Sequence, residues 1–262
     1  HLRDKEHLSV LEHGNIVIHV TQEHTTQLRG VIRDLFDTRT AYHQIYDHTF
    51  IGGNIRAWME TLDLLQETDL LSYMCFRQFF MKNYPTLFNY LIEEEVTNSD
   101  VFNLQAVRTE DQCKLLRRHH YDLPLFTFHI TCDRGITHEL VRHRTLSFTQ
   151  ESTRYVNYGN RGVIFIRPPC GDYSYLIDNH LDQVAELYTR LVQEGGVPPQ
   201  YARDVLPNLL KSEIYMTGTW GAWRHFIYLR GAHNAHPRIQ VIARDIGEYF
   251  NKFFEQGERD EV

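Results

Sequence analysis

Short segments with the pattern of β-strands alternate along this chain with longer segments whose apolar residues recur at helical spacing. In residues 14–20, Ile16, Ile18 and Val20 alternate with neighbours on the opposite face, which predicts a half-buried strand. Further strands are predicted at 124–131 and at 162–169, where two prolines end the apolar run. Helices are predicted over the ranges that carry an apolar stripe, namely 133–146, 181–196, 198–207, 222–231 and 236–254. The alternation predicts an α+β fold, in which helices pack on a small antiparallel sheet.

The chain of 262 residues suits a single domain over 1–262, and its hydrophobic content of 42% is enough for a sizeable core. The section 25–120 has a less regular pattern, and we interpret it as an insertion within that domain. In this section, 57–65 and 71–84 have helical spacing, and 96–105 has the composition of a loop.

Charge and composition argue against several classes of protein. The formal net charge of −7 argues against nucleic acid as a partner, because such proteins usually carry a basic face. The four cysteines contain no CxxC pair, which predicts reduced thiols rather than a disulfide framework or a zinc site. No apolar run approaches the roughly 20 residues of a membrane span, and no signal peptide is visible, so we expect a cytoplasmic protein without membrane contact.

The most unusual stretch is 142–154, where Arg142, His143 and Arg144 precede a run of hydroxyl and amide side chains. A plain interpretation is a cationic helix C-terminus, which the helix dipole favours. Zinc is disfavoured, because His138 and His143 are five residues apart and so lie about 140° apart around a helix with 3.6 residues per turn. A nucleophilic serine is also disfavoured, because the stretch has no GxSxG elbow.

The remaining interpretation of this stretch is a site for anions. The planar guanidinium of arginine matches the geometry of phosphate. Three consecutive helical side chains fan out by about 100° each, so they would hold two ligands, or one ligand and a partner subunit. The hydroxyl, amide and guanidinium groups that follow suit the polar edge of a base together with a phosphate, and they come from Ser147, Gln150, Ser152 and Arg154.

Residues 142–152, RHRTLSFTQES, fit the RHR-x7-S signature of the flavin-dependent thymidylate synthases. The flanking stretches THELVRHR and QESTRYVNY also resemble this family, as do 7–13, 202–213 and 217–231. The resemblance covers 7–20 and 124–250 and is weak over about 25–120. It implies a homotetramer with active sites between subunits, in which FAD assists the conversion of dUMP to dTMP. Methylenetetrahydrofolate would supply the carbon, and NADPH would reduce the flavin.

The resemblance also implies roles for single residues. Contacts to FAD are implied for Ser9, Arg142, His143, Arg144, Gln150 and His225. Contacts to dUMP are implied for Glu139, Arg142, Gln150, Glu151, Ser152, Arg154, Arg203 and Arg230. Arg230 would be the catalytic residue, because a guanidinium beside N3 and O2 of uracil stabilises negative charge on the ring. Since arginine stays protonated, its role is electrostatic, and neither a protein nucleophile nor a metal is required.

The chain departs from the family pattern at two places. Many relatives have Asn-x-Arg, for FAD, where this chain has Thr219 and Gly221, whereas Asn54-x-Arg56 occurs in the extra section. We hypothesise that Asn54 and Arg56 replace the lost flavin contacts, the alternative being ordinary strand or loop sequence. Glu139 stands where many relatives have glutamine, and its carboxylate would accept well from an amino group. This leaves open two alternatives, an enzyme that modifies another pyrimidine nucleotide, for example by hydroxymethylation, and a non-catalytic flavin-binding or nucleotide-binding protein.

The aromatic residues near the C-terminal end have two interpretations. Trp220, Trp223 and Phe226 could stack on a ligand, but their spacing favours a place in the core.

Overall fold

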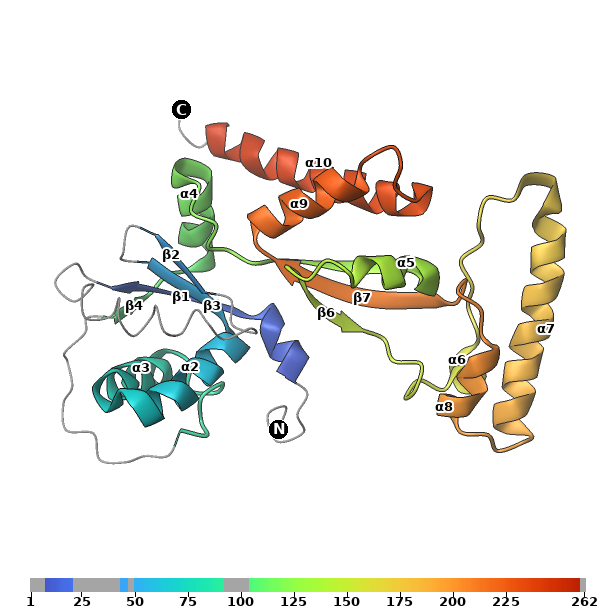
Figure 1. The fold of residues 1–262 in the computed structure, drawn as a ribbon, viewed down its shortest axis with the longest axis horizontal. Helices are drawn as coiled ribbons and strands as arrows, with labels where there is room; N and C mark the ends of the chain where they lie inside the picture. The colour runs from blue at the N-terminus through green and yellow to red at the C-terminus, as the bar shows by residue number, and fades with distance from the viewer. Residues whose placement is uncertain (1–7, 21–42, 47–49, 92–103, 260–262) are drawn as a thin grey trace.

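The computed structural model describes residues 8–20, 43–46, 50–91 and 104–259, which form two antiparallel sheets with helices packed on them (Figure 1). The predicted α+β class with small antiparallel sheets is confirmed. The first sheet has the strand order β2-β3-β1-β4, and the second has the order β5-β7-β6.

The first sheet, which we call sheet A, is built mainly from the N-terminal third of the chain. Its strands are β1 (Asn15–Val20), β2 (His43–Tyr46), β3 (Phe50–Asn54) and β4 (Leu104–Ala106). The 3-10 helix η1 (Leu8–His13) precedes β1, and the helices α2 (Ile55–Thr68) and α3 (Leu70–Asn83) follow β3. The strand predicted at 14–20 and the helical spacing at 57–65 and 71–84 are therefore confirmed.

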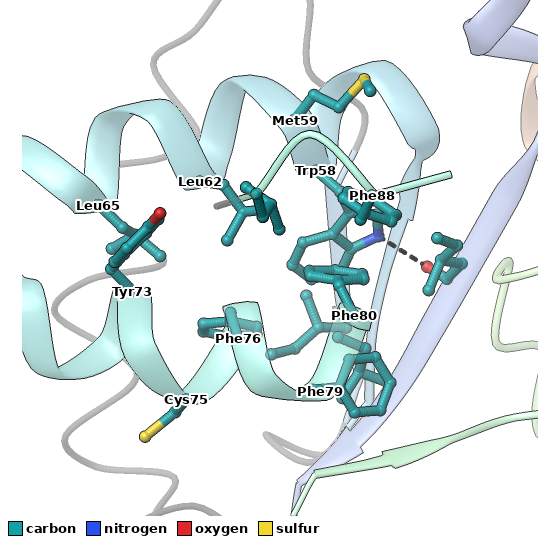
Figure 2. Close-up of a cluster of buried hydrophobic side chains, with 14 of the residues drawn as sticks. Trp58, Met59, Leu62, Leu65, Tyr73, Cys75, Phe76, Phe79, Phe80 and Phe88 are labelled. Atoms are coloured by element: carbon teal, nitrogen blue, oxygen red, sulfur yellow. Dashed lines mark hydrogen bonds between the residues drawn. The ribbon is translucent and has the colours of Figure 1, made fainter. Parts of the chain in front are cut away.

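Sheet A has its own hydrophobic core, in which a cluster of aromatic rings packs together with aliphatic side chains (Figure 2). Trp58 is buried against Phe76 and Phe80, with ring centroids 5.7 and 5.3 Å away, and its indole Nε1 donates to the carbonyl of Ile16 at 3.0 Å. That bond satisfies the polar atom of a fully buried ring and ties α2 to the neighbouring strand.

The second sheet, sheet B, consists of β5 (Phe126–Asp133), β6 (Ser147–Gln150) and the central strand β7 (Lys211–Gly218). Its helices are α4 (Thr109–His119), α5 (Arg134–Leu140), α9 (Trp220–Arg230) and α10 (Pro237–Arg259). Ile130, Ile214 and Met216 are buried in one core with these helices. Side chains alternate between the faces of a sheet, so the opposite face carries polar residues such as Thr127 and His129.

The aromatic residues Trp220, Trp223 and Phe226 pack in the core of sheet B. Trp223 and Phe226 are fully buried, and Trp223 Nε1 donates to the carbonyl of Phe126 at 3.0 Å. Trp220 is partly buried and lies 4.6 Å from Phe250 between ring centroids. The preference for a core position over a stacking platform is confirmed.

A third, smaller core lies beyond the end of sheet B, where α7 (Ser174–Gln193) extends along the edge of the molecule (Figure 1). Tyr158, Tyr188, Ala202 and Leu210 form its buried centre. The short elements around it are α6 (Tyr158–Arg161), η3 (Gly171–Tyr173), α8 (Pro199–Ala202) and η4 (Arg203–Val205).

The other strand and helix predictions have mixed outcomes. The strand at 124–131 and the helices at 181–196, 222–231 and 236–254 are confirmed, with shifted ends. The prediction of a buried strand at 162–169 is wrong, because only Phe165 makes a bridge, to Leu210, and Ile164 is 56% exposed. Instead of one helix, 198–207 contains α8 and η4.

Two further outcomes concern the remaining segments. Of the loop predicted at 96–105, residues 96–103 lie outside the described residues, and 104–105 belong to β4. Within the part of the chain that the structure describes, none of the helices has the length and apolarity needed to cross a bilayer.

Candidate active site

The helix that leads into the basic triplet is shorter than predicted. Asp133 caps α5 by accepting from the backbone N–H of Ile136 at 3.2 Å, and the helix ends at Leu140 rather than near 146. Two tighter turns follow, in which His143 N donates to the Leu140 carbonyl and Leu146 N donates to the His143 carbonyl. These turns bury His143 and Leu146. The burial of these two side chains therefore outweighs the helix propensity of the residues that follow Leu140.

This turn corrects the expected arrangement of the triplet. Arg142, His143 and Arg144 do not fan out from a helix, because they lie in the turn after it. His143 points inward and is 8% exposed, whereas both arginines are exposed. The inward histidine meets the C-terminal end of α9, where Arg230 lies.

Arg230 is held by two residues of the α5 segment. Its Nε donates to His143 Nε2 at 2.8 Å, one terminal nitrogen donates to Glu139 Oε2 at 2.8 Å, and the other donates to the Glu139 carbonyl at 3.1 Å. These contacts use three of the five N–H groups of a guanidinium. Within the described residues the other two N–H groups of Arg230 have no protein acceptor, so they are available to a ligand.

His143 accepts the bond from Arg230, so it must be neutral with its proton on Nδ1. The pKa of His143 is lowered to about 4, mainly by burial and to a smaller extent by the positive charges of Arg230, His225 and Arg142. The ring of Phe226 packs edge-on against the imidazole at 4.9 Å between centroids. The environment therefore favours the one protonation state that can orient Arg230.

Acidification is expected to destabilise the wild-type protein more than a His143→Asn variant. The unfolded imidazole titrates near 6.5 and the folded one near 4, so the unfolded chain takes up the proton first. The stability that His143 contributes is therefore full above pH 6.5 and decreases as the pH falls toward 4, by about 1–3 kcal/mol in total. Urea unfolding at pH 7, 6 and 5 measures this difference. His138→Asn, at an exposed position on α5, serves as the control, and parallel pH profiles for the wild type and His143→Asn would contradict the expectation.

A cavity of about 340 Å³ opens beside this arginine–histidine pair. Its lining consists of Arg142, His143, Arg144, Thr145, His225, Leu229 and Arg230. With three guanidinium groups around it, the cavity has the chemistry of an anion site, and five of its seven lining residues are among the predicted site residues. Glu139 is not part of the lining and acts on the cavity through Arg230.

Gln150 lies at the end of β6 and is fixed from two sides. Its side-chain nitrogen donates to Thr137 Oγ1 at 2.9 Å and to Ser212 Oγ at 3.0 Å. Thr137 belongs to α5, the helix that also carries Glu139. The contacts therefore connect the end of β6 to the segment that holds Arg230.

The residues after β6 form a separate polar region. Ser152 and Arg154 are exposed, and Arg203 donates to Thr153 Oγ1 at 3.4 Å. Glu151 lines a second cavity of about 300 Å³, together with Tyr158, Arg161, Gly162, Ile164, Lys211 and Glu213. Burial, with the nearby Glu151 carboxylate as a smaller cause, raises the pKa of Tyr158 to about 12. The structure thus groups the predicted residues into two neighbouring regions rather than one pocket.

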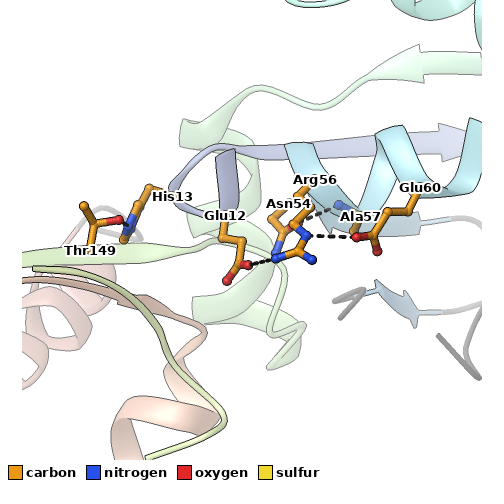
Figure 3. Close-up of polar contacts among 7 residues, drawn as sticks. All are labelled: Glu12, His13, Asn54, Arg56, Ala57, Glu60 and Thr149. Carbon is orange, nitrogen blue, oxygen red and sulfur yellow. Dashed lines mark hydrogen bonds and ion pairs between the residues drawn. The ribbon is translucent and has the colours of Figure 1, made fainter. Parts of the chain in front are cut away.

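Asn54 and Arg56, for which a flavin contact is hypothesised, make hydrogen bonds and ion pairs within the chain (Figure 3). Asn54 is buried and caps α2 by accepting from Ala57 N at 2.7 Å. Arg56 contacts the carboxylates of Glu12 at 2.7 Å and Glu60 at 2.8 Å. Both side chains therefore have a structural role, and their contact with a flavin stays a prediction, as does that of Ser9 in η1.

The N-terminus of α9, where relatives are expected to carry Asn-x-Arg, is occupied by the chain itself. Thr219 caps the helix, and Asp122 Oδ2 accepts from the backbone N–H of Gly221 at 2.8 Å. A Cβ atom at position 221 would lie 2.6 Å from Asp122 Oδ2, so a side chain there would force Asp122 to move. The departure from the family pattern is thus part of the local structure.

Several residues of the two regions are absent from the sequence prediction. Thr145 and Leu229 line the first cavity, Arg161 and Lys211 line the second, and Thr137 and Ser212 hold Gln150. The alternation along β7 could have indicated that Ser212 shares a face with Ile214, but the contact to Gln150 depends on the pairing of β6 with β7. Among the described residues no cluster of three or more His, Cys, Asp or Glu side chains could hold a metal ion.

The chain is an α+β protein with an arginine-lined cavity between the turn that follows α5 and the C-terminal end of α9. The family model described as thymidylate synthase complementing protein matches residues 104–255, which is more than half of the chain. The chain therefore belongs to the thymidylate synthase complementing protein family.

Individual relatives agree with this assignment. A protein of Mycobacteroides abscessus named flavin-dependent thymidylate synthase is 34% identical over 136 residues, which cover 45% of this chain and 54% of the relative. A protein of the same name from Corynebacterium diphtheriae is 37% identical over 134 residues, covering 42% of this chain and 50% of the relative. The chain thus spans about half the length of the curated relatives it matches.

Proposed function

We propose that this chain acts as a flavin-dependent thymidylate synthase, which converts dUMP to dTMP. The observation that carries the proposal is the placement of Arg230 at the edge of an arginine-lined cavity, with its guanidinium oriented by His143 and Glu139. The names of the relatives support the activity and the flavin. Methylenetetrahydrofolate is proposed as the carbon donor and NADPH as the reductant.

The residues around the first cavity fit a cofactor that carries phosphate groups. Arg142 and Arg144 are exposed at the cavity and can pair with a pyrophosphate, and His143 and His225 provide imidazole edges. We propose that these residues, with Gln150 and Ser9, hold FAD. When bound, the flavin supplies the hydride for the reaction. Because the cavity is open and small, it would hold only part of the cofactor.

For the nucleotide, the proposal assigns the hydroxyl and guanidinium groups after β6. The residues that would bind dUMP are Glu139, Arg142, Gln150, Glu151, Ser152, Arg154 and Arg203. Arg230 would lie beside N3 and O2 of the uracil ring, where its fixed positive charge stabilises negative charge as the ring becomes nucleophilic at C5. Preorganisation supports this role, because His143 and Glu139 orient the guanidinium before the substrate binds.

The two regions of predicted residues are consistent with a site shared between copies of the chain. Three of the predicted residues are exposed in the single chain, namely Ser152, Arg154 and Arg203. Large aromatic residues nearby, such as Tyr155 and Tyr201, are exposed as well. We propose a homotetramer in which such surfaces meet and complete the active sites. Exposed aromatic groups of this kind are frequent at interfaces between subunits.

An absorption spectrum of the purified protein tests the proposed function directly. We expect oxidised flavin bands that bleach when NADPH is added without oxygen, followed by formation of dTMP from dUMP and methylenetetrahydrofolate. Arg142→Ala is expected to lower the flavin content, whereas Arg190→Ala, which changes an exposed arginine of α7, should retain it. A colourless protein that cannot be reconstituted with FAD and does not bind dUMP would refute the proposal.

A second candidate is the modification of an amino-bearing pyrimidine nucleotide. It is favoured by one observation, the carboxylate of Glu139 in contact with the proposed base-binding arginine, since a carboxylate accepts well from an amino group. Turnover of dCMP in place of dUMP under the same conditions would support this candidate. Flavin binding without turnover of either nucleotide would instead indicate a non-catalytic protein.

A further inference from the structure

Residues 12–14 join sheet A to sheet B by contacts in opposite directions (Figure 3). Toward sheet A, Glu12 pairs with Arg56 at 2.7 Å, and the carbonyl of Gly14 accepts from the backbone N–H of Ile55 at 3.0 Å. These two contacts attach the end of η1 to the first turn of α2. Toward sheet B, His13 reaches Thr149 on β6.

The imidazole of His13 contacts two strands of sheet B directly and the third through a hydroxyl. Nδ1 lies 2.6 Å from Thr217 Oγ1, Nε2 lies 2.8 Å from Thr149 Oγ1, and Thr217 Oγ1 lies 2.6 Å from Thr127 Oγ1. A neutral imidazole has one donor and one acceptor nitrogen, so one of the two hydroxyls bonded to the ring donates to it and the other accepts from it. Burial lowers the pKa of His13, which favours the neutral form.

The junction is polar, whereas the packing on either side of it is apolar. Leu11 belongs to the core of sheet A, and Leu146 belongs to the core of sheet B. Apolar contacts are not directional, but hydrogen bonds with defined lengths and angles fix the position of the groups that they join. His13 is therefore suited to set the place of one sheet relative to the other.

β6 is the less supported of the two edge strands of sheet B, because in the described part of the chain it pairs with β7 over four residues, whereas β5 pairs with β7 over eight. Its neighbouring side chains point to opposite faces. Thr149 is held by His13 on one face, and Gln150 is held by Thr137 and Ser212 on the other. Fixing Thr149 thus fixes the residue next to it, from which the polar stretch 150–154 continues.

We propose that His13 is a positioning residue that holds β6 in place and thereby sets the geometry of the stretch 150–154. The proposal rests on the proposed function only where it assigns that stretch to the nucleotide. His13 touches no ligand in this scheme and acts through Thr149. The link also couples the placement of the section that contains Asn54 and Arg56 to the strand that carries Gln150.

Hydrogen exchange measured by mass spectrometry on the full chain tests the contact without relying on activity. In His13→Ala and in the nearly isosteric Thr149→Val, we expect peptides covering 147–154 to exchange at least about fivefold faster, while peptides from α7 stay unchanged. The double variant should exchange no faster than His13→Ala, because that change already removes the bond to Thr149. His129→Ala changes a half-exposed histidine on the same face of sheet B and is the matched control.

The binding of dUMP to the same proteins, measured by calorimetry, tests the consequence for the site. We expect roughly tenfold weaker binding for His13→Ala and Thr149→Val, with His129→Ala close to wild type. Wild-type exchange rates in the β6 peptides would overturn the proposal, and so would faster exchange with unchanged dUMP affinity. If wild-type protein binds no dUMP, the proposed function fails, while the exchange data still decide whether His13 holds β6. Should His13→Ala fail to fold, Thr149→Val alone supplies both measurements.

Discussion

Replacing Arg230 with alanine is expected to leave a folded protein that still binds flavin but has lost most of its turnover. The guanidinium is fixed by His143 and Glu139, so it provides positive charge at the cavity without reorganisation during the reaction. Removal of a preorganised donor of this kind costs about 10²–10³ in kcat. Steady-state kinetics with dUMP, together with the flavin absorbance of each preparation, measure the effect.

The controls for this variant separate charge from geometry. Arg230→Lys keeps the charge but cannot reproduce the planar set of contacts to His143 and Glu139, so most of the loss should remain. Arg244→Ala removes an exposed arginine that pairs with Asp245 on α10, and its kinetics should match those of the wild type. Wild-type rates in Arg230→Ala would exclude the assigned role.

Breaking the pair between Asp133 and Arg238 is expected to cause the largest loss of stability among changes to single polar residues near the site. Asp133 is 1% exposed, caps α5 and pairs with Arg238 at the start of α10. Arg238→Ala would leave a buried carboxylate without its partner, which typically costs about 3–5 kcal/mol. Asp133→Ala would also remove the cap of α5, which is worth about 0.5–2 kcal/mol.

Chemical denaturation at neutral pH measures both variants. The matched control is the exposed pair of Arg190 and Glu194 on α7, where Arg190→Ala should cost less than about 1 kcal/mol. Asp133→Asn separates the two contributions, because its side-chain oxygen can still cap the helix while the charge is lost. A loss below 1 kcal/mol in Arg238→Ala would show that the carboxylate is compensated by other groups.

The sequence allowed the long amphipathic elements to be predicted, because their burial follows directly from side-chain spacing. In α10, Ile239, Ala243, Ile246 and Phe250 recur at helical spacing, and all are buried. The end of α5 could not be predicted in the same way. The burial of His143 beneath Arg230, 87 positions later in the chain, decides where that helix ends. Local propensity contains no information about such a distant partner.

β7 is absent from the sequence prediction, although Ser212, Ile214 and Met216 alternate on one face. Its central place in sheet B follows from pairing with two distant strands, and pairing partners cannot be deduced from the pattern of one strand. For the site, the resemblance identified most of the residues that line the first cavity. The resemblance could not show that the cavity residues lie in a different region from Arg203. It also could not show that His143 orients the guanidinium of Arg230.

Asp122, whose carboxylate contacts the first turn of α9, also limits which side chains position 221 can carry. The carboxylate already occupies the positive end of the helix, and position 221 has no room for a side chain while Asp122 stays in place. A side chain at position 221 therefore requires the Asp122 carboxylate to move away from the N-terminus of the helix, so the two positions are coupled through this contact.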